Sequence, residues 1–411
     1  MSDRYPGGLI RKTPPTVVGP TDGEGGSAPG IWTTDQVAYY EKEGLWPKPV
    51  LSRELYSAGE NLSGQLGINN NASQSSPVQI GSGTIWNAIS ANYNTAMATT
   101  TDGKLYYWGQ GNAGRSGTGV ENPAAKSSPV QIGSLTNWST MTVMPETVVA
   151  VKTDGTLWSW GNNGDGQLGN NNRGVNYSSP IQVGSLNDWV KVESTITPAV
   201  LALKTDGTIW SWGRNQFGLL GLDLASLDHR SSPVQIGSDT DWSYIAGGAY
   251  NFAAIKTSGS LWIWGSNDNG QLGNNGATSG MSSPIQVGAL TTWEKVASGR
   301  ETILAVKTDG TLWAWGRNGG GSLGINNTIS KSSPVQVGSQ TNWKTPGAGR
   351  YSTLVTKTDG TLWSWGANFK GELARTNLAY SSSPIQVGAE TNWDFAKSSQ
   401  DEGFTLIRTK G

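Results

Sequence analysis

The chain has 411 residues, including 57 Gly, 20 Trp, a single His and no Cys, and its formal net charge is −1 with 14% charged residues. The lack of Cys excludes a disulfide scaffold, a thiolate metal site and a Cys nucleophile, and one His excludes a multi-His metal site. A net charge near zero gives no electrostatic attraction to nucleic acid, no apolar run is long enough for a membrane span, and the first residues lack the apolar core of a signal peptide.

Residues 1–30 are rich in Gly, Pro and Thr, which predicts an extended N-terminal arm. After this arm, Thr33 and Gln36 form a capping-box pattern, and Trp32 and Val37 are placed for a hydrophobic staple. Gly44 stands where a helix ends. We therefore expect one short helix near residues 34–43, too short to be stable alone.

The aromatic residues of this segment need a second surface, either the rest of the same chain or another subunit. The pattern Gly30-x-Trp32-Thr33 followed by Gly44-x-Trp46-Pro47 resembles a short N-terminal module of tailed-bacteriophage virion proteins. The resemblance implies that residues 1–50 are a virion attachment module that binds other virion subunits. The candidate attachment residues are Ile31, Trp32, Val37, Tyr39, Tyr40, Leu45, Trp46 and Pro47.

The remainder of the chain, residues 51–411, is built from a sevenfold repeat. A segment such as LWSWG closes on a Gly every 50 to 52 residues, at Gly59, Gly109, Gly161, Gly213, Gly265, Gly316 and Gly366. A Ser-Ser-Pro triplet and a lone Trp recur in the same register. Three markers in one sevenfold register predict repeats of one supersecondary unit.

One repeat, residues 293–338, predicts four short strands. Strand signals lie at 295–298 and 303–308, and Asp309-Gly310 is a hairpin turn. The return strand, 312–316, alternates its Trp residues with Leu and Ala, so the two sets point to opposite faces. Pro334 opens the last strand, which suits a sheet edge. Four strands in about 50 residues are typical of a propeller blade.

The ends of the repeat array predict a closed ring. Residues 404–411 match the strand that precedes LWSWG in each repeat, whereas the first LWSWG-like segment, Leu55–Gly59, lacks that strand. Their pairing would close an all-β, seven-bladed β-propeller without exposed sheet edges. We expect the 18 Trp beyond residue 50 to be buried between blades.

The sequence of Thr153–Gly169, TDGTLWSWGNNGDGQLG, resembles the repeat of the regulator of chromosome condensation family. That resemblance implies a seven-bladed propeller; the founding member is an exchange factor for a nuclear GTPase and binds nucleosomes. Repeats of the family often carry a His eight residues before the turn Gly, and this chain has none there. It also lacks an inserted wedge and a basic arm, so an exchange-factor role is disfavoured.

Positions at which the repeats differ from one another are not dictated by the scaffold. One such position precedes the second strand of each repeat, and Tyr and Arg there are typical of binding surfaces. We expect a partner-binding face for a partner subunit or a host-surface glycan or protein, although unconstrained loop variation explains the pattern equally well. Its residues are Tyr93, Tyr250, Arg300, Arg350 and Tyr351.

Catalytic chemistry has little support. His229 could act with Ser231 or Ser232, but the Ser-Ser-Pro triplet occurs in six repeats without a His. Paired carboxylates at Asp239 and Asp241 are typical of solvated loops. The chain lacks an acidic calcium loop and the Lys of a phosphate-binding loop. We therefore predict no catalytic residue, no metal and no cofactor.

The main functional hypothesis is a non-enzymatic virion protein (fibre, decoration or tail-associated), located in the phage particle, anchored by residues 1–50 and displaying the propeller. The first alternative is an intracellular protein-interaction or regulatory module, and the second is a propeller enzyme such as a lyase or hydrolase. None of these hypotheses involves nucleic-acid binding or membrane insertion.

Overall fold

The computed structural model describes residues 4–5, 8–9, 53–82, 86–276, 279–377, 379–399 and 404–409. The chain divides into two compact units, residues 1–52 with Gly411 and residues 53–410. In the first unit, strands β1 (Arg4–Tyr5) and β2 (Gly8–Leu9) form an antiparallel pair. The predicted helix and attachment residues 31–47 lie outside the described residues, so both remain predictions.

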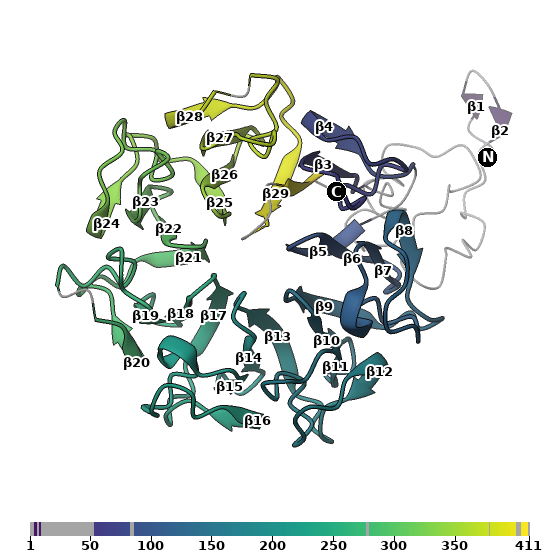
Figure 1. Ribbon diagram of the computed structural model, residues 1–411. Coiled ribbons are helices and arrows are strands. Elements are labelled where there is room, and N and C mark those ends of the chain that lie inside the picture. Colours follow the sequence, from purple (N-terminus) through teal and green to yellow (C-terminus); the bar gives the residue numbers. More distant parts are fainter. Residues whose placement is uncertain are drawn as a thin grey trace. The chain divides into compact units, whose positions relative to one another are not determined.

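The second unit is a ring of seven four-stranded antiparallel sheets, as the repeat pattern predicts (Figure 1). The first two blades are β5 (Trp86–Asn92), β6 (Thr95–Thr100), β7 (Leu105–Gly109), β8 (Lys126–Gln131), and β9 (Trp138–Val143), β10 (Thr147–Lys152), β11 (Leu157–Gly161), β12 (Tyr177–Gln182). The third and fourth are β13 (Trp189–Ser194), β14 (Ala199–Lys204), β15 (Ile209–Gly213), β16 (Arg230–Gln235), and β17 (Trp242–Gly247), β18 (Asn251–Lys256), β19 (Leu261–Gly265), β20 (Met281–Gln286). The fifth and sixth are β21 (Trp293–Ser298), β22 (Thr302–Lys307), β23 (Leu312–Gly316), β24 (Lys331–Gln336), and β25 (Trp343–Ala348), β26 (Ser352–Lys357), β27 (Leu362–Gly366), β28 (Ser381–Gln386).

The seventh blade joins the two ends of the repeat array. Its strand order is β29 (Trp393–Ser398), β30 (Phe404–Thr409), β3 (Leu55–Gly59) and β4 (Gln74–Gln79). Strands β3 and β30 are antiparallel, with Leu55 opposite Arg408 and Gly59 opposite Phe404. The predicted closure of the ring by strand exchange is therefore confirmed.

Strand boundaries differ slightly from the prediction within the repeat at residues 293–338. β21 starts two residues before the expected strand, and β24 starts three residues before Pro334. Pro334 therefore lies inside the outermost strand of its blade, where its missing N–H costs no ladder bond to a neighbour. Beyond the strands, the described residues contain two 3-10 turns, η1 (Asn112–Gly114) and η2 (Gln216–Gly218), and no helix able to cross a membrane.

The core lies between neighbouring blades, and the Trp before the closing Gly, which six of the seven segments carry, is fully buried there. In the fifth blade Trp315 packs against the fourth blade, whereas Leu312 and Ala314 pack against the sixth, so the predicted two-faced strand is confirmed. The indole nitrogen also donates to a carbonyl of the preceding blade, as Trp315 Nε1 does to Gln271 at 2.9 Å. A Cβ on Gly273 would lie 2.7 Å from that nitrogen, so only Gly fits.

Five blades also enclose a lysine between two Trp rings, which was not predicted. In the fifth blade Lys307 Nζ lies 4.9 Å from the ring centre of Trp293 and 3.8 Å from that of Trp313. The same arrangement recurs at Lys152, Lys204, Lys256 and Lys357. Cation–π attraction thus adds to the burial of apolar area by these rings.

The loops gather at the two ends of the blades. The connection from the first to the second strand of a blade lies beside the connection from the third to the fourth. In the second blade, for example, the amide of Asn162 in the latter donates to the carbonyl of Glu146 in the former at 2.9 Å. We call this end the loop face. The opposite end, the turn face, carries the Asp-Gly turns and the links between blades, as shown by the 2.9 Å bond from Trp138 N to Gly103 O.

Candidate interaction surfaces

Four of the five predicted partner-binding residues lie in neighbouring loops of the loop face. These loops, which follow β17, β21 and β25, are linked by backbone hydrogen bonds from Ala249 N to Gly299 O (2.9 Å) and from Arg300 N to Gly349 O (3.1 Å). The structure thus brings Tyr250, Arg300, Arg350 and Tyr351 onto one sector of three blades. We call these four residues the arginine–tyrosine cluster.

Contacts within the arginine–tyrosine cluster hold its rings and guanidinium groups. Arg300 Nη2 donates to the hydroxyl of Tyr250 at 3.4 Å, and its guanidinium carbon lies 5.8 Å from the centre of that ring. The guanidinium carbon of Arg350 lies 5.1 Å from the ring centre of Tyr351. All four residues remain partly exposed, so their side chains offer cationic and aromatic groups that are already positioned.

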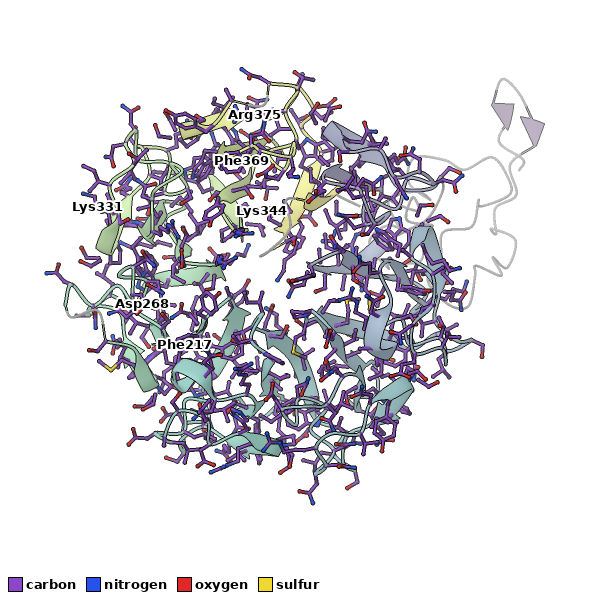
Figure 2. All side chains as sticks on the ribbon, viewed as in Figure 1. Phe217, Asp268, Lys331, Lys344, Phe369 and Arg375 are labelled. Carbon is purple, nitrogen blue, oxygen red and sulfur yellow. The ribbon has the colours of Figure 1, made fainter. Side chains whose placement is uncertain are left out.

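Two residues that the sequence reasoning missed extend this sector. Arg317 lies 5.5 Å from the ring centre of Tyr351, and its Nη1 pairs with Glu301 at 2.7 Å. The hydrogen bond that Arg317 donates to Glu301 raises the pKa of Arg317. Phe217 packs edge-on against Tyr250, with ring centres 5.5 Å apart, and lies on a different blade from the exposed Phe369 (Figure 2).

Tyr93 is separate from the arginine–tyrosine cluster. It follows β5 in the first blade, has a positive φ of 51° and is 37% exposed. With Arg115, Glu146 and Arg214 it lines a cavity of about 370 Å³ on the loop face of the first three blades. The five residues predicted for a partner-binding face therefore lie in two separate places on the loop face.

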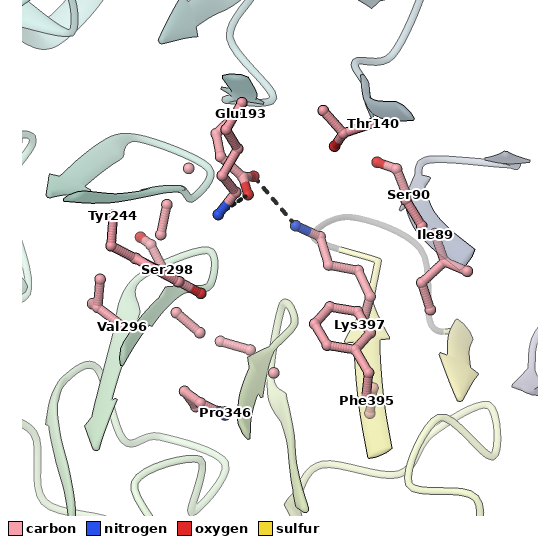
Figure 3. A pocket seen from close by; sticks show the side chains of 18 of the residues that line it. Ile89, Ser90, Thr140, Glu193, Tyr244, Val296, Ser298, Pro346, Phe395 and Lys397 are labelled. Carbon is pink, nitrogen blue, oxygen red and sulfur yellow. Dashed lines mark ion pairs between the residues drawn. The ribbon is translucent and has the colours of Figure 1, made fainter. Parts of the chain in front are cut away.

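The inner strands of all seven blades line a central cavity of about 230 Å³. Lys397 of the seventh blade reaches Glu193 of the third blade, with Nζ and Oε2 3.6 Å apart, and Lys191 Nζ lies 3.2 Å from Oε1 (Figure 3). Burial raises the pKa of Glu193, but the two lysines outweigh it and the net shift is downward. This group was missed, although Glu193 and Lys397 occupy one inner-strand position that is small in other repeats, which was a usable signal.

His229 has a structural position. Its Nδ1 accepts a hydrogen bond from the amide of Asn215 at 3.0 Å, and its Nε2 lies 3.5 Å from Asp165. Side chains four residues before the repeat Pro accept the same amide bond in other blades: Ser73 Oγ, Asn176 Oδ1 and Ser330 Oγ. Burial lowers the pKa of His229, which favours the neutral ring that can accept.

The described residues contain no group of three or more His, Asp or Glu side chains that could hold a metal ion. His229 replaces the Ser or Asn of other repeats in a loop-closing hydrogen bond, so its presence is explained without catalysis.

Comparison with known families identifies the repeats. Residues 154–194, 206–255, 258–306 and 309–355 match the model described as the regulator of chromosome condensation (RCC1) repeat. Residues 242–271 and 293–322 match a second model with the same description. The RCC1 repeats that match therefore lie within residues 154–355 of the seven-bladed β-propeller.

Curated relatives are similar to this chain over only part of their length. The human E3 ubiquitin-protein ligase HERC2 is 28% identical over 67% of this chain and 6% of its own length. The mitochondrial RCC1 domain-containing protein RUG3 of Arabidopsis thaliana is 31% identical over 50% and 47%. The ultraviolet-B receptor UVR8 of the same plant is 26% identical over 72% and 66%. The chain thus spans less than two thirds of the length of each of these relatives.

Solved structures share the fold. Human WBSCR16 superposes with a TM-score of 0.78 at 16% identity, covering 88% of this chain and 100% of that one. Yeast RCC1 (Prp20), in a structure with Kap60, superposes with a TM-score of 0.76 at 16% identity, covering 88% and 89%. At this identity the likeness concerns the fold alone.

Proposed function

We propose that this RCC1-repeat propeller is a non-enzymatic protein-interaction module that binds a partner through the arginine–tyrosine cluster. The observation that carries the proposal is the linkage of Tyr250, Arg300, Arg350 and Tyr351 across three neighbouring loops. Tyr and Arg are enriched among residues that dominate interface energies, and these side chains are held before a partner arrives, which lowers the entropy cost of binding.

The relatives support an interaction role of this general kind. They include a receptor, a ubiquitin ligase and a protein solved in complex with another protein, so propellers with these repeats occur in proteins of diverse activity. The receptor and the ligase share sequence similarity with part of this chain, and yeast RCC1 shares its fold. Function on such a fold depends on its loops. The reading of the chain as a regulatory or interaction module is therefore favoured over the virion reading.

The test is partner capture by in-cell crosslinking with mass spectrometry, followed by binding measurements with the purified partner. The double variant Arg300→Ala/Arg350→Ala is expected to lose the crosslinks, and Tyr351→Ala to weaken them. Lys104→Ala is the matched control and is expected to keep them, because Lys104 is a half-exposed residue on the turn face that pairs with Asp102. Unchanged affinity of the folded double variant would contradict the proposal.

A second candidate function is attachment to a virion, supported by the pattern Gly30-x-Trp32-Thr33 and Gly44-x-Trp46-Pro47. In that case residues 1–50 bind other virion subunits and the propeller is displayed for assembly or for host-surface contacts. Deletion of residues 1–50 is expected to leave a folded propeller that is absent from purified particles. Retention of the truncated chain at full copy number would contradict this candidate.

A further inference from the structure

The cavity beside Tyr93 is lined by a buried guanidinium group at a position where several other repeats have an amide. Arg115 is only 2% exposed and occupies the position held by Gln65, Gln167 and Gln271 in other blades. Those glutamines bond their own loop, as Gln167 Oε1 does by accepting from Asp165 N at 2.8 Å. A charged side chain at this buried position costs stability that a glutamine would not.

The guanidinium of Arg115 is only partly compensated. Its Nε donates to the carbonyl of Gln110 at 3.1 Å and its Nη2 to the side-chain oxygen of Gln110 at 3.2 Å. Within the described part of the chain, no carboxylate lies within 4 Å of it. Burial lowers the pKa of Arg115 to about 10, an effect that the more distant Glu146 partly offsets.

Other groups that line the cavity suit a polar ligand without net charge. Arg115 and Arg214 are balanced by Glu146 and Asp165, and Arg214 and Asp165 are 3.9 Å apart. Glu146 is exposed at the rim and accepts hydrogen bonds, whereas Arg115 only donates. A donor and an acceptor that share a cavity without pairing with each other can be bridged by vicinal hydroxyl groups, since each hydroxyl both donates and accepts.

Tyr93 provides the apolar part of such a site. The residue is 37% exposed beside the cavity, and its backbone has a positive φ that non-glycine residues seldom adopt. Strain of this kind tends to be retained at ligand-binding positions. A half-exposed aromatic ring packs well against the C–H face of a sugar ring, and a cavity of about 370 Å³ is within the usual range for small-molecule sites.

We propose that the cavity lined by Tyr93, Arg115 and Glu146 binds a neutral saccharide, with Arg115 and Glu146 hydrogen-bonded to neighbouring hydroxyl groups and Tyr93 packed on the sugar ring. This site is separate from the arginine–tyrosine cluster, so it does not depend on the proposed partner. It gives the loop face a second ligand, of a different chemical class.

The test is ligand-observed saturation-transfer NMR on the full chain with glucose, galactose and mannose as separate probes. At least one sugar is expected to receive saturation from the wild-type protein. Arg115→Gln restores the residue of other blades and should fold, yet it is expected to weaken the affinity about tenfold or more by removing a charged hydrogen bond. Glu146→Gln and Tyr93→Ala are expected to weaken it too.

Arg230→Gln on the outer strand β16 is the matched control, because Arg230 pairs with Asp228 and does not line the cavity. It is expected to bind the sugar as the wild type does. Three results would overturn the proposal: no transfer to any of the sugars, equal transfer with Arg115→Gln and wild type, or displacement of the bound sugar by acetate, which would make the cavity an anion site.

Discussion

The indole nitrogen of Trp160 donates to the carbonyl oxygen of Arg115 at 2.9 Å, and this bond joins the second blade to a loop of the first. Equivalent bonds join other neighbouring blades, from Trp108 to Gln65 and from Trp212 to Gln167. Each such Trp therefore both fills the space between blades and fixes the loop that precedes it.

The substitution Trp160→Phe tests this role. It keeps most of the ring but leaves the Arg115 carbonyl without its donor, so we expect a loss of about 1–2 kcal/mol in the free energy of unfolding, measured with urea. Trp138→Phe is the matched control, because Trp138 is also buried but its Nε1 has no hydrogen-bond partner within the described ranges. Equal losses in both variants would show that the bond contributes nothing.

The enclosed lysines are expected to stabilise their blades. Lys307→Ala removes a cation between Trp293 and Trp313 together with its buried stem, so we expect a loss of roughly 1–2 kcal/mol in unfolding free energy. Lys104→Ala, at a half-exposed position with one carboxylate partner, is expected to change it much less. A similar change in both would contradict a stabilising role for the enclosure.

Glu372 occupies a position held by Gln in three other blades and is 6% exposed. Burial is the main cause of its raised pKa, and Glu60 adds to it. Because the folded-state pKa lies above the ordinary value of 4.5, Glu372 lowers stability as the pH rises through and above that value. We expect Glu372→Gln to raise the free energy of unfolding by about 0.5–2 kcal/mol at pH 7.

The same linkage predicts that the difference between Glu372→Gln and wild type shrinks as the pH is lowered toward and below 4.5, because the carboxyl becomes increasingly protonated in both the folded and the unfolded state. Urea unfolding at pH 7 and near pH 4.5 measures both values. A difference that does not depend on pH would rule out charge burial as its cause.

Glu193 is expected to hold the centre of the ring together. Glu193→Gln leaves Lys191 and Lys397 without their shared carboxylate, so we expect a loss of about 3 kcal/mol in unfolding free energy at pH 7. Lys397→Met keeps the pair between Glu193 and Lys191 and should cost less. Since the folded pKa of Glu193 is lowered, its contribution is present above the ordinary pKa and disappears as the pH falls through the folded value.

His229 gives a prediction that separates structure from catalysis. His229→Asn is expected to leave stability nearly unchanged, because Asn176 accepts the equivalent amide bond in the second blade, whereas His229→Ala should lose about 1 kcal/mol. The lowered pKa of His229 also implies that stability falls as the pH drops below 6.5 in the wild type but less so in His229→Asn. Thermal unfolding at pH 7 and pH 5.5 measures both effects.

The ring and its closure could be predicted because they depend on residues that recur within the repeat. Trp313 and Trp315 alternate along one strand, and Leu55–Gly59 lacks a partner that residues 404–409 supply. The enclosure of Lys307 depends on three positions of one repeat, so the sequence contains the residues needed to predict it. The periodicity alone, however, does not indicate that a lysine is buried between two rings.

The candidate sites could be predicted only in part. Comparison among repeats indicated Tyr250 and Arg300 because loop positions vary, and the structure shows that they touch. The salt bridge between Glu193 and Lys397 joins the third and seventh blades. These residues are so far apart in the sequence that no local pattern predicts their contact. Arg115 was passed over because a single departure in a loop gives no sign that the side chain is buried.

The pairing of β3 with β30 has a consequence for synthesis of the chain. The amide of Glu54 bonds to Thr409, 355 positions later, so the seventh blade cannot form until nearly all of the propeller has been translated. At about 5–20 residues per second, β3 waits roughly 20–70 s for its partner. During that time its edge can pair with other nascent chains, so ribosome-bound intermediates of this protein should depend on chaperones more than the finished ring does.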